Sequence, residues 1–111
     1  MKNFKIKPRS PKIAGSMNKL ETAYAQRLEL LRQSGQIRNF RFEAVKLRLA
    51  ENTFYTPDFY VVTEQEIQLH EVKGFWEDDA RVKIKVAAFE YPEFQFIAVK
   101  KNKGEWIFEN F

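Results

Sequence analysis

In the first third of the chain, apolar residues recur every three or four positions, at Met17, Leu20, Tyr24, Leu28 and Leu31. This spacing predicts an amphipathic helix over residues 17–34. Asn18 followed three positions later by Glu21 fits a capping box at its start, and Ser34-Gly35 is typical of a helix end. Because Glu21 lies at the edge of the apolar stripe, its carboxylate is expected to face along a neighbouring sheet rather than out to water.

The pattern then alternates with a period of two, which is typical of strands. Strands are predicted over residues 37–49, 54–62 and 67–73, separated by turns at 50–53 and 63–66. Connections this short favour antiparallel hairpins between neighbouring strands.

A second helix is predicted over residues 78–90, with Asp78 and Asp79 as its caps. Its stronger apolar side consists of Val82, Val86 and Phe89, and its weaker one of Ala80, Ile84, Ala87 and Ala88. A small domain covers only one of these sides with its own sheet. The weaker side is therefore expected to pack against the first helix or against a second subunit in a homodimer.

Two more strands are predicted over residues 94–100 and 105–109, with a turn between them. The crossover from strand to strand through the second helix implies one parallel pair. The expected fold class is α/β, with a mixed, mostly antiparallel sheet flanked by two helices in the order α-β-β-β-α-β-β.

Length and charge divide the chain into a domain and an arm. The 111 residues suit a single domain, assigned to residues 16–111. Residues 1–15 carry five basic residues and no acid, which predicts a basic flexible arm. We expect DNA-phosphate contacts from this arm and from the second helix, with a solvated surface as the alternative. The residues concerned are Lys5, Lys7, Arg9, Lys12, Arg81, Lys83 and Lys85.

Composition narrows the possible metal chemistry. The chain has no Cys and a single His, which excludes a disulfide framework, a thiolate site and a multi-histidine zinc site. A catalytic metal would need oxygen ligands, which favour Mg²⁺ or Mn²⁺. No apolar run approaches the length of a membrane span and no signal-peptide core is visible, so a cytoplasmic location without a membrane partner is expected.

Asp58, Glu71 and Lys73 form the candidate catalytic group. Asp58 lies early in one predicted strand, and Glu71 and Lys73 lie late in the next, so an antiparallel hairpin brings them to one end of the sheet. Glu71 and Lys73 are two positions apart and share a face. Two carboxylates can hold Mg²⁺ beside a phosphodiester, and a nearby lysine can position water or stabilise the transition state.

Pro57-Asp58 followed by Glu71-Val72-Lys73 resembles the motif of the PD-(D/E)xK nuclease superfamily, and the similarity covers roughly residues 17–100. Glu21 matches the acidic residue that this superfamily often carries on the helix before the sheet. The order of elements resembles its restriction-endonuclease-like core. Among its members, small phage nucleases of the endonuclease I type, which resolve Holliday junctions, are the most similar in character, together with a group of short phage proteins of unassigned function.

The resemblance implies a role for each motif residue. Asp58 and Glu71 would ligate Mg²⁺, with the Val72 carbonyl as a third ligand and Glu21 binding directly or through water. Lys73 would assist the nucleophile. The implied protein is a phage-type, metal-dependent DNA endonuclease that acts on branched DNA.

Other interpretations stay open on the sequence alone. The chain could be a nicking or double-strand endonuclease of the transposition or restriction type, or a non-catalytic DNA-binding module. Glu71 and Lys73 could form a mere surface ion pair, and Glu21 could serve only as a cap. His70 points to the face opposite Glu71 and is interpreted as packing or surface. Phe75 and Trp76 could stack on a splayed base, but buried core is the default for them.

Overall fold

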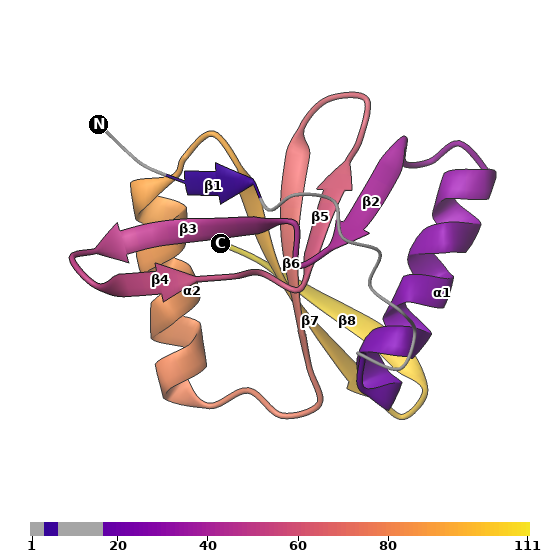
Figure 1. The fold of residues 1–111 in the computed structure, drawn as a ribbon. Coiled ribbons are helices and arrows are strands. Elements are labelled where there is room, and N and C mark those ends of the chain that lie inside the picture. Colours follow the sequence, from indigo (N-terminus) through magenta and orange to yellow (C-terminus); the bar gives the residue numbers. More distant parts are fainter. Residues whose placement is uncertain (1–3, 7–16) are drawn as a thin grey trace.

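The computed structural model describes residues 4–6 and 17–111. These form two helices and eight strands, which are β1 (Phe4–Ile6), α1 (Lys19–Gln33), β2 (Asn39–Phe42), β3 (Val45–Ala50), β4 (Thr53–Tyr55), β5 (Phe59–Val62), β6 (Ile67–Lys73), α2 (Asp78–Glu90), β7 (Gln95–Asn102) and β8 (Glu105–Asn110). Figure 1 shows the two helices on different sides of the central strands. The α/β class and the mixed sheet are as predicted.

The larger sheet has five strands in the order β2-β5-β6-β7-β8. Its β6–β7 pair is parallel and its other pairs are antiparallel. The parallel pair is the one joined through α2, which confirms the predicted crossover. β7 and β8 are joined by the two-residue turn Lys103-Gly104, and both residues have positive φ. Such a turn matches the twist of the strands that it joins.

A second sheet, with the order β1-β3-β4, was not predicted. The strands expected over residues 37–49 and 54–62 are each divided between the two sheets. The first breaks at Glu43, whose φ of 49° turns the chain away from β2. The second breaks at Pro57, which is fully buried and has no N–H to continue a ladder. β1 adds three residues of the N-terminal arm to this sheet, paired antiparallel with β3.

Helix α1 begins and ends as the sequence predicts. Asn18 and Glu21 form the capping box, with Asn18 Oδ1 accepting the Glu21 N–H at 2.7 Å and Glu21 Oε1 accepting the Asn18 N–H at 3.0 Å. At the other end Gly35 has a φ of 81°, and the Gly35 and Gln36 amides donate back to the last turn. This is a Schellman motif, which requires a residue with positive φ after the cap.

The face of α1 centred on Tyr24 packs on one side of the larger sheet. The buried residues of this layer are Tyr24, Leu28, Ile37, Phe59, Val61, Val72 and Val99. The opposite side of that sheet is covered by α2 and by the smaller sheet, and the buried residues there include Val45, Leu47, Tyr55, Leu69, Ile84, Ala87, Tyr91 and Phe96. The larger sheet is therefore the middle layer of the fold.

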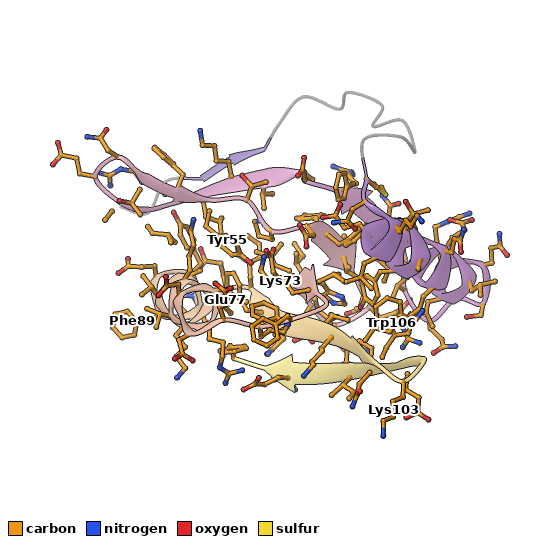
Figure 2. All side chains as sticks on the ribbon, turned by 90° about the horizontal axis from the view of Figure 1, so that it is seen from below. Tyr55, Lys73, Glu77, Phe89, Lys103 and Trp106 are labelled. Carbon is orange, nitrogen blue, oxygen red and sulfur yellow. The ribbon has the colours of Figure 1, made fainter. Side chains whose placement is uncertain are left out.

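Helix α2 packs with the side that the sequence ranked weaker. Ile84 and Ala87 are buried against the sheets, while Val82, Val86 and Phe89 are 57%, 41% and 82% exposed. Figure 2 shows Phe89 on the outer side of this helix. The prediction that the alanine-rich side contacts α1 or a second subunit is therefore wrong. The space beside the sheet is already filled by large rings such as Tyr91 and Phe96, so a closely packed helix needs small residues there.

The N-terminus of helix α2 differs from the prediction. Helix α2 has Glu77 at its N-cap, without a side-chain hydrogen bond, and Asp78 and Asp79 lie in the first turn instead of capping it. Carboxylates in that turn still interact favourably with the helix dipole.

Over the part of the chain that the structure describes, neither helix is long and apolar enough to cross a membrane.

Candidate active site

Asp58 and Glu71 lie side by side where β5 begins and β6 nears its end. The antiparallel register pairs Phe59 with His70, so Asp58, one residue earlier, stands opposite Glu71, one residue later. The hairpin therefore brings the two carboxylates to one end of the sheet, as the sequence predicts. Glu71 lies on the side of the sheet that faces α2 and the smaller sheet, because Leu69 of the same strand packs there. Asp58 lies on that side too, because its neighbour Phe59 packs on the opposite, α1 side.

The two acidic residues are held by each other's backbone. Asp58 Oδ2 accepts the N–H of Val72 at 2.8 Å, and Glu71 Oε1 accepts the N–H of Asp58 at 3.2 Å. The last backbone pair of the hairpin is Phe59 with His70. Beyond it, these two side-chain oxygens accept the N–H groups that strand carbonyls would otherwise accept. The two hydrogen bonds fix both carboxylates while leaving one oxygen of each, Asp58 Oδ1 and Glu71 Oε2, directed elsewhere.

Lys73 completes the predicted group. Its Nζ lies 3.7 Å from Glu71 Oε2 and 5.9 Å from the centre of the Trp76 ring. The Lys73 side chain is 38% exposed, whereas that of Glu71 is 13% exposed. Figure 2 looks onto this end of the sheet and shows Lys73 between the two helices. The ammonium group therefore lies at the boundary between the carboxylate pair and solvent, which differs from the surface ion pair considered as the alternative.

Tyr55 is a site residue that sequence reasoning missed. It comes from β4 of the smaller sheet, and its hydroxyl donates to Glu71 Oε1 at 3.1 Å. Burial raises the pKa of Tyr55 well above its usual value, and the charge of Glu71 raises it further. The phenol is therefore a permanent proton donor to Glu71. Its position three residues before Asp58 gave no signal, because the contact depends on the chain crossing between sheets at Pro57.

Burial makes this carboxylate pair expensive to ionise. Desolvation raises the pKa of Asp58 to about 8, with the charge of Glu71 as the next cause, while the Val72 N–H acts in the opposite direction. Desolvation also raises the pKa of Glu71, against the lowering effects of Lys73 and the Tyr55 hydrogen bond. Two charges in one desolvated site repel each other unless a cation is bound between them. The raised pKa values therefore mean that the pair favours a bound proton or a bound cation over two free charges.

Glu21 is near the pair but is engaged elsewhere. Its charge contributes to the raised pKa of both Asp58 and Glu71. Its carboxylate is bound to the Asn18 amide in the capping box, on the helix that covers the other face of the sheet. The capping role is thus shown, and the contribution to metal binding stays a prediction.

The donors of this end of the sheet fit a hard divalent cation. The second oxygens of the pair are Asp58 Oδ1 and Glu71 Oε2, the latter 3.7 Å from Lys73 Nζ. The carbonyl of Val72 faces the Asp58 edge, because its own N–H does. Carboxylate and carbonyl oxygens are the ligands that Mg²⁺ and Mn²⁺ prefer. Among residues 4–6 and 17–111, no three His, Cys, Asp or Glu side chains are grouped closely enough to hold one ion. Two carboxylates with one carbonyl are therefore the set that this geometry offers.

His70 belongs to the core on the α1 side, as predicted. Its Nε2–H donates to Gln68 Oε1 at 2.9 Å, which leaves Nδ1 to accept the Tyr24 hydroxyl proton at 2.7 Å. Burial, with the charge of Arg27 as the second cause, lowers the pKa of His70 to about 4. The imidazole is therefore neutral at neutral pH and lies across the sheet from the acidic pair.

The predicted DNA-contacting residues of α2 differ in their surroundings. Arg81 is held by Glu109 of β8, with one N–H···O bond of 2.7 Å. Lys83 lies 5.8 Å above the ring of Tyr55, beside the candidate site. Lys85 is on an exposed part of the helix. Of the arm, Lys5 lies in β1 opposite Lys46, and Lys7, Arg9 and Lys12 lie outside the described residues.

Comparisons with protein-family models, with curated proteins and with solved structures give no significant match. The function of the chain must therefore be inferred from the residues of the site.

Proposed function

We propose that this chain is a metal-dependent DNA endonuclease that hydrolyses phosphodiester bonds at Asp58, Glu71 and Lys73, with Mg²⁺ as cofactor and Mn²⁺ as its substitute. One observation carries the proposal. The buried carboxylate of Asp58 and the part-buried one of Glu71, both with raised pKa values, share one end of a sheet, and the partly exposed Lys73 ammonium lies 3.7 Å from Glu71. A purely structural pair would be costly there, because replacing buried charges by apolar groups is often neutral or stabilising.

In this proposal the chain's residues divide the work. Asp58, Glu71 and the Val72 carbonyl would hold the cation, and Tyr55 keeps Glu71 oriented through its hydrogen bond. The cation supplies neutralisation of the phosphate and a lower pKa for the attacking water. Lys73 holds that water by hydrogen bonding and stabilises the charge that develops on the phosphoryl oxygens. Water attacks phosphorus as one P–O ester bond breaks, and a proton of the water passes through solvent to the leaving oxygen. The products are a phosphate monoester and a free hydroxyl.

The fold also agrees with this proposal. The hairpin of β5 and β6 carries the motif, α1 precedes it, and the crossover through α2 leads to the parallel strand β7. This arrangement is the one expected for a restriction-endonuclease-like core. Branched DNA is the proposed substrate, on the resemblance of the motif and element order to small phage resolvases.

Single-turnover cleavage tests the proposal. Labelled four-way junction and matched linear duplex would be incubated with excess protein in Mg²⁺, Mn²⁺ or EDTA, with binding measured separately in Ca²⁺. We expect cleavage only with Mg²⁺ or Mn²⁺, and a loss of at least a hundredfold in Asp58→Asn and Lys73→Ala. Lys101→Ala is the matched control, since Lys101 also lies over an indole ring, that of Trp106, but on the β7–β8 hairpin.

Each outcome has a clear meaning. Cleavage by Asp58→Asn and Lys73→Ala at the wild-type rate would contradict the assignment of the site. DNA binding without cleavage under any metal would favour the non-catalytic binding module. Equal rates on junction and duplex would retain the nuclease but contradict the branched substrate.

A further inference from the structure

Phe75 is an exposed aromatic ring beside the candidate site. It lies in the short segment between β6 and α2, two residues after Lys73, and is 74% exposed. The default expectation of a buried ring is therefore wrong for Phe75. Two residues of extended chain span at most about 7 Å, or about two base steps along a DNA strand. A nucleotide near the one bound at Lys73 is thus within reach of this ring.

The neighbours of Phe75 are fixed, so its exposure does not come from a loose segment. Trp76 packs against the core, and its Nε1–H donates to the Val99 carbonyl at 3.3 Å. The Lys73 ammonium lies over the same indole ring. Phe75 therefore lies between Lys73 at the site and the anchored Trp76, with its ring exposed to solvent.

Two ammonium groups near this ring can attract the phosphates of a nucleic acid strand. Lys73 lies beside Glu71, and Lys83 lies over the ring of Tyr55, whose hydroxyl contacts Glu71. The exposed carboxylates of Glu77, Asp78 and Asp79 follow Phe75 in the chain, so the stacking of a base, and not charge alone, must hold the strand here. An exposed phenyl ring offers a flat apolar face, on which a base of any sequence can stack. Inside a duplex both faces of a base are already covered by its neighbours, so only an unpaired base can use the ring.

We propose that Phe75 is a stacking platform for an unpaired nucleobase next to the phosphate bound at Asp58 and Glu71. This inference rests on the proposed function and names its substrate class, DNA with unpaired bases at a fork or junction. The ring selects the substrate by stacking, while the carboxylates and Lys73 act on the phosphate.

The test uses a forked duplex with 2-aminopurine at the first unpaired position and a fully paired duplex of the same sequence. Fluorescence quenching and affinity are measured in Ca²⁺, and cleavage in Mg²⁺. Phe75→Ala should lose most of the quenching and about tenfold in affinity and cleavage of the fork, and less than twofold on the paired duplex. Phe75→Trp should retain the wild-type behaviour, and Phe75→Leu should behave like Phe75→Ala because it is apolar without a flat ring.

Phe89→Ala is the matched control, because it removes a similarly exposed phenyl ring from the outer side of α2 (Figure 2). It should leave quenching and the fork-to-duplex ratio unchanged. Unaltered quenching and ratio in Phe75→Ala, or an equal loss in Phe89→Ala, would overturn the stacking role even if Mg²⁺-dependent cleavage is intact. Ring-dependent quenching without any cleavage would support stacking and contradict the nuclease proposal instead.

Discussion

Asp58 and Glu71 hold each other in place through the backbone, since Glu71 Oε1 accepts the amide proton of Asp58 and Asp58 Oδ2 accepts that of Val72, the residue after Glu71. The arrangement fixes two repelling carboxylates within one hairpin. Folding of the chain therefore includes an electrostatic cost at this end of the sheet, and that cost leads to measurable predictions.

Asp58→Asn should stabilise the metal-free protein at alkaline pH. The pKa of Asp58 is raised from 3.8 to about 8, so the favourable contribution of the neutral acid is fully present below the unfolded value and is lost as pH rises through the folded value. Asparagine keeps an oxygen for the Val72 N–H and carries no charge. We expect a gain of about 2 kcal/mol at pH 8 and little difference at pH 4, measured by urea unfolding in EDTA. A less stable variant at pH 8 would contradict the repulsion.

Divalent cations should make the wild type more stable than Asp58→Asn, which reverses the order expected for the metal-free proteins. Mn²⁺ bound by the native pair stabilises the wild type by mass action, about 2.7 kcal/mol at a hundredfold excess over its Kd. Asp58→Asn should gain almost nothing from the same addition. Thermal unfolding with and without Mn²⁺ checks the prediction, and an equal shift in both proteins would place the cation elsewhere.

Tyr55→Phe should weaken cation binding without disturbing the fold. The hydroxyl donates to Glu71 and lowers the pKa of that carboxyl, so its loss makes Glu71 harder to ionise. We expect about tenfold lower Mn²⁺ affinity, from the loss of a hydrogen bond to a charged group worth about 1.5 kcal/mol, and an upward shift of the pH dependence of binding. Calorimetry across pH 6–9 measures both. An unchanged affinity would show that the hydrogen bond is dispensable.

Variants of Glu21 should separate its capping role from its charge. Glu21→Ala removes the acceptor for the Asn18 amide and should cost about 1 kcal/mol of stability. Glu21→Gln keeps an acceptor and should cost less. If Glu21 also holds a metal-bound water, both variants should lose cleavage to a similar extent, about tenfold. Retained cleavage in Glu21→Gln would restrict the residue to the cap.

His70 should make the protein sensitive to acid. Its pKa is lowered from 6.5 to about 4, so the stability contributed by the neutral imidazole is complete above pH 6.5 and is lost as pH falls through the folded value. The loss amounts to at most about 3 kcal/mol. The chain has one histidine, so its ring protons can be followed by NMR without ambiguity. A titration midpoint near 6.5 in the folded protein would contradict the burial of the ring.

The sequence predicted the parts of the fold that depend on local pattern. The capping box at Asn18 and Glu21, the hairpin that pairs Asp58 with Glu71, and the parallel crossover through α2 all follow from short-range spacing and connection length. The candidate site was visible for the same reason. Its three principal residues lie on two consecutive strands of one hairpin.

What the sequence did not reveal depends on contacts between distant segments. The division of residues 37–49 into two strands is visible in the sequence on closer inspection. The apolar positions change from even numbers, at Phe40 and Phe42, to odd numbers, at Val45 and Leu47, although the period of two is kept. The orientation of α2 has no such signal in the sequence. Which side of the helix is covered depends on the volume that rings of other strands occupy, so the larger Val82 and Phe89 lie outward.

The chain's passage from one sheet to the other at Pro57 also has a kinetic consequence. Tyr55 belongs to the smaller sheet and its partner Glu71 to the larger one. Local separation of the smaller sheet would therefore expose the acidic pair to water while leaving its own hairpin intact. Such an opening would let the amides of β3 and β4 exchange with solvent faster than those of β6. The exchange rates of β3 and β4 would therefore measure how often Tyr55 separates from Glu71.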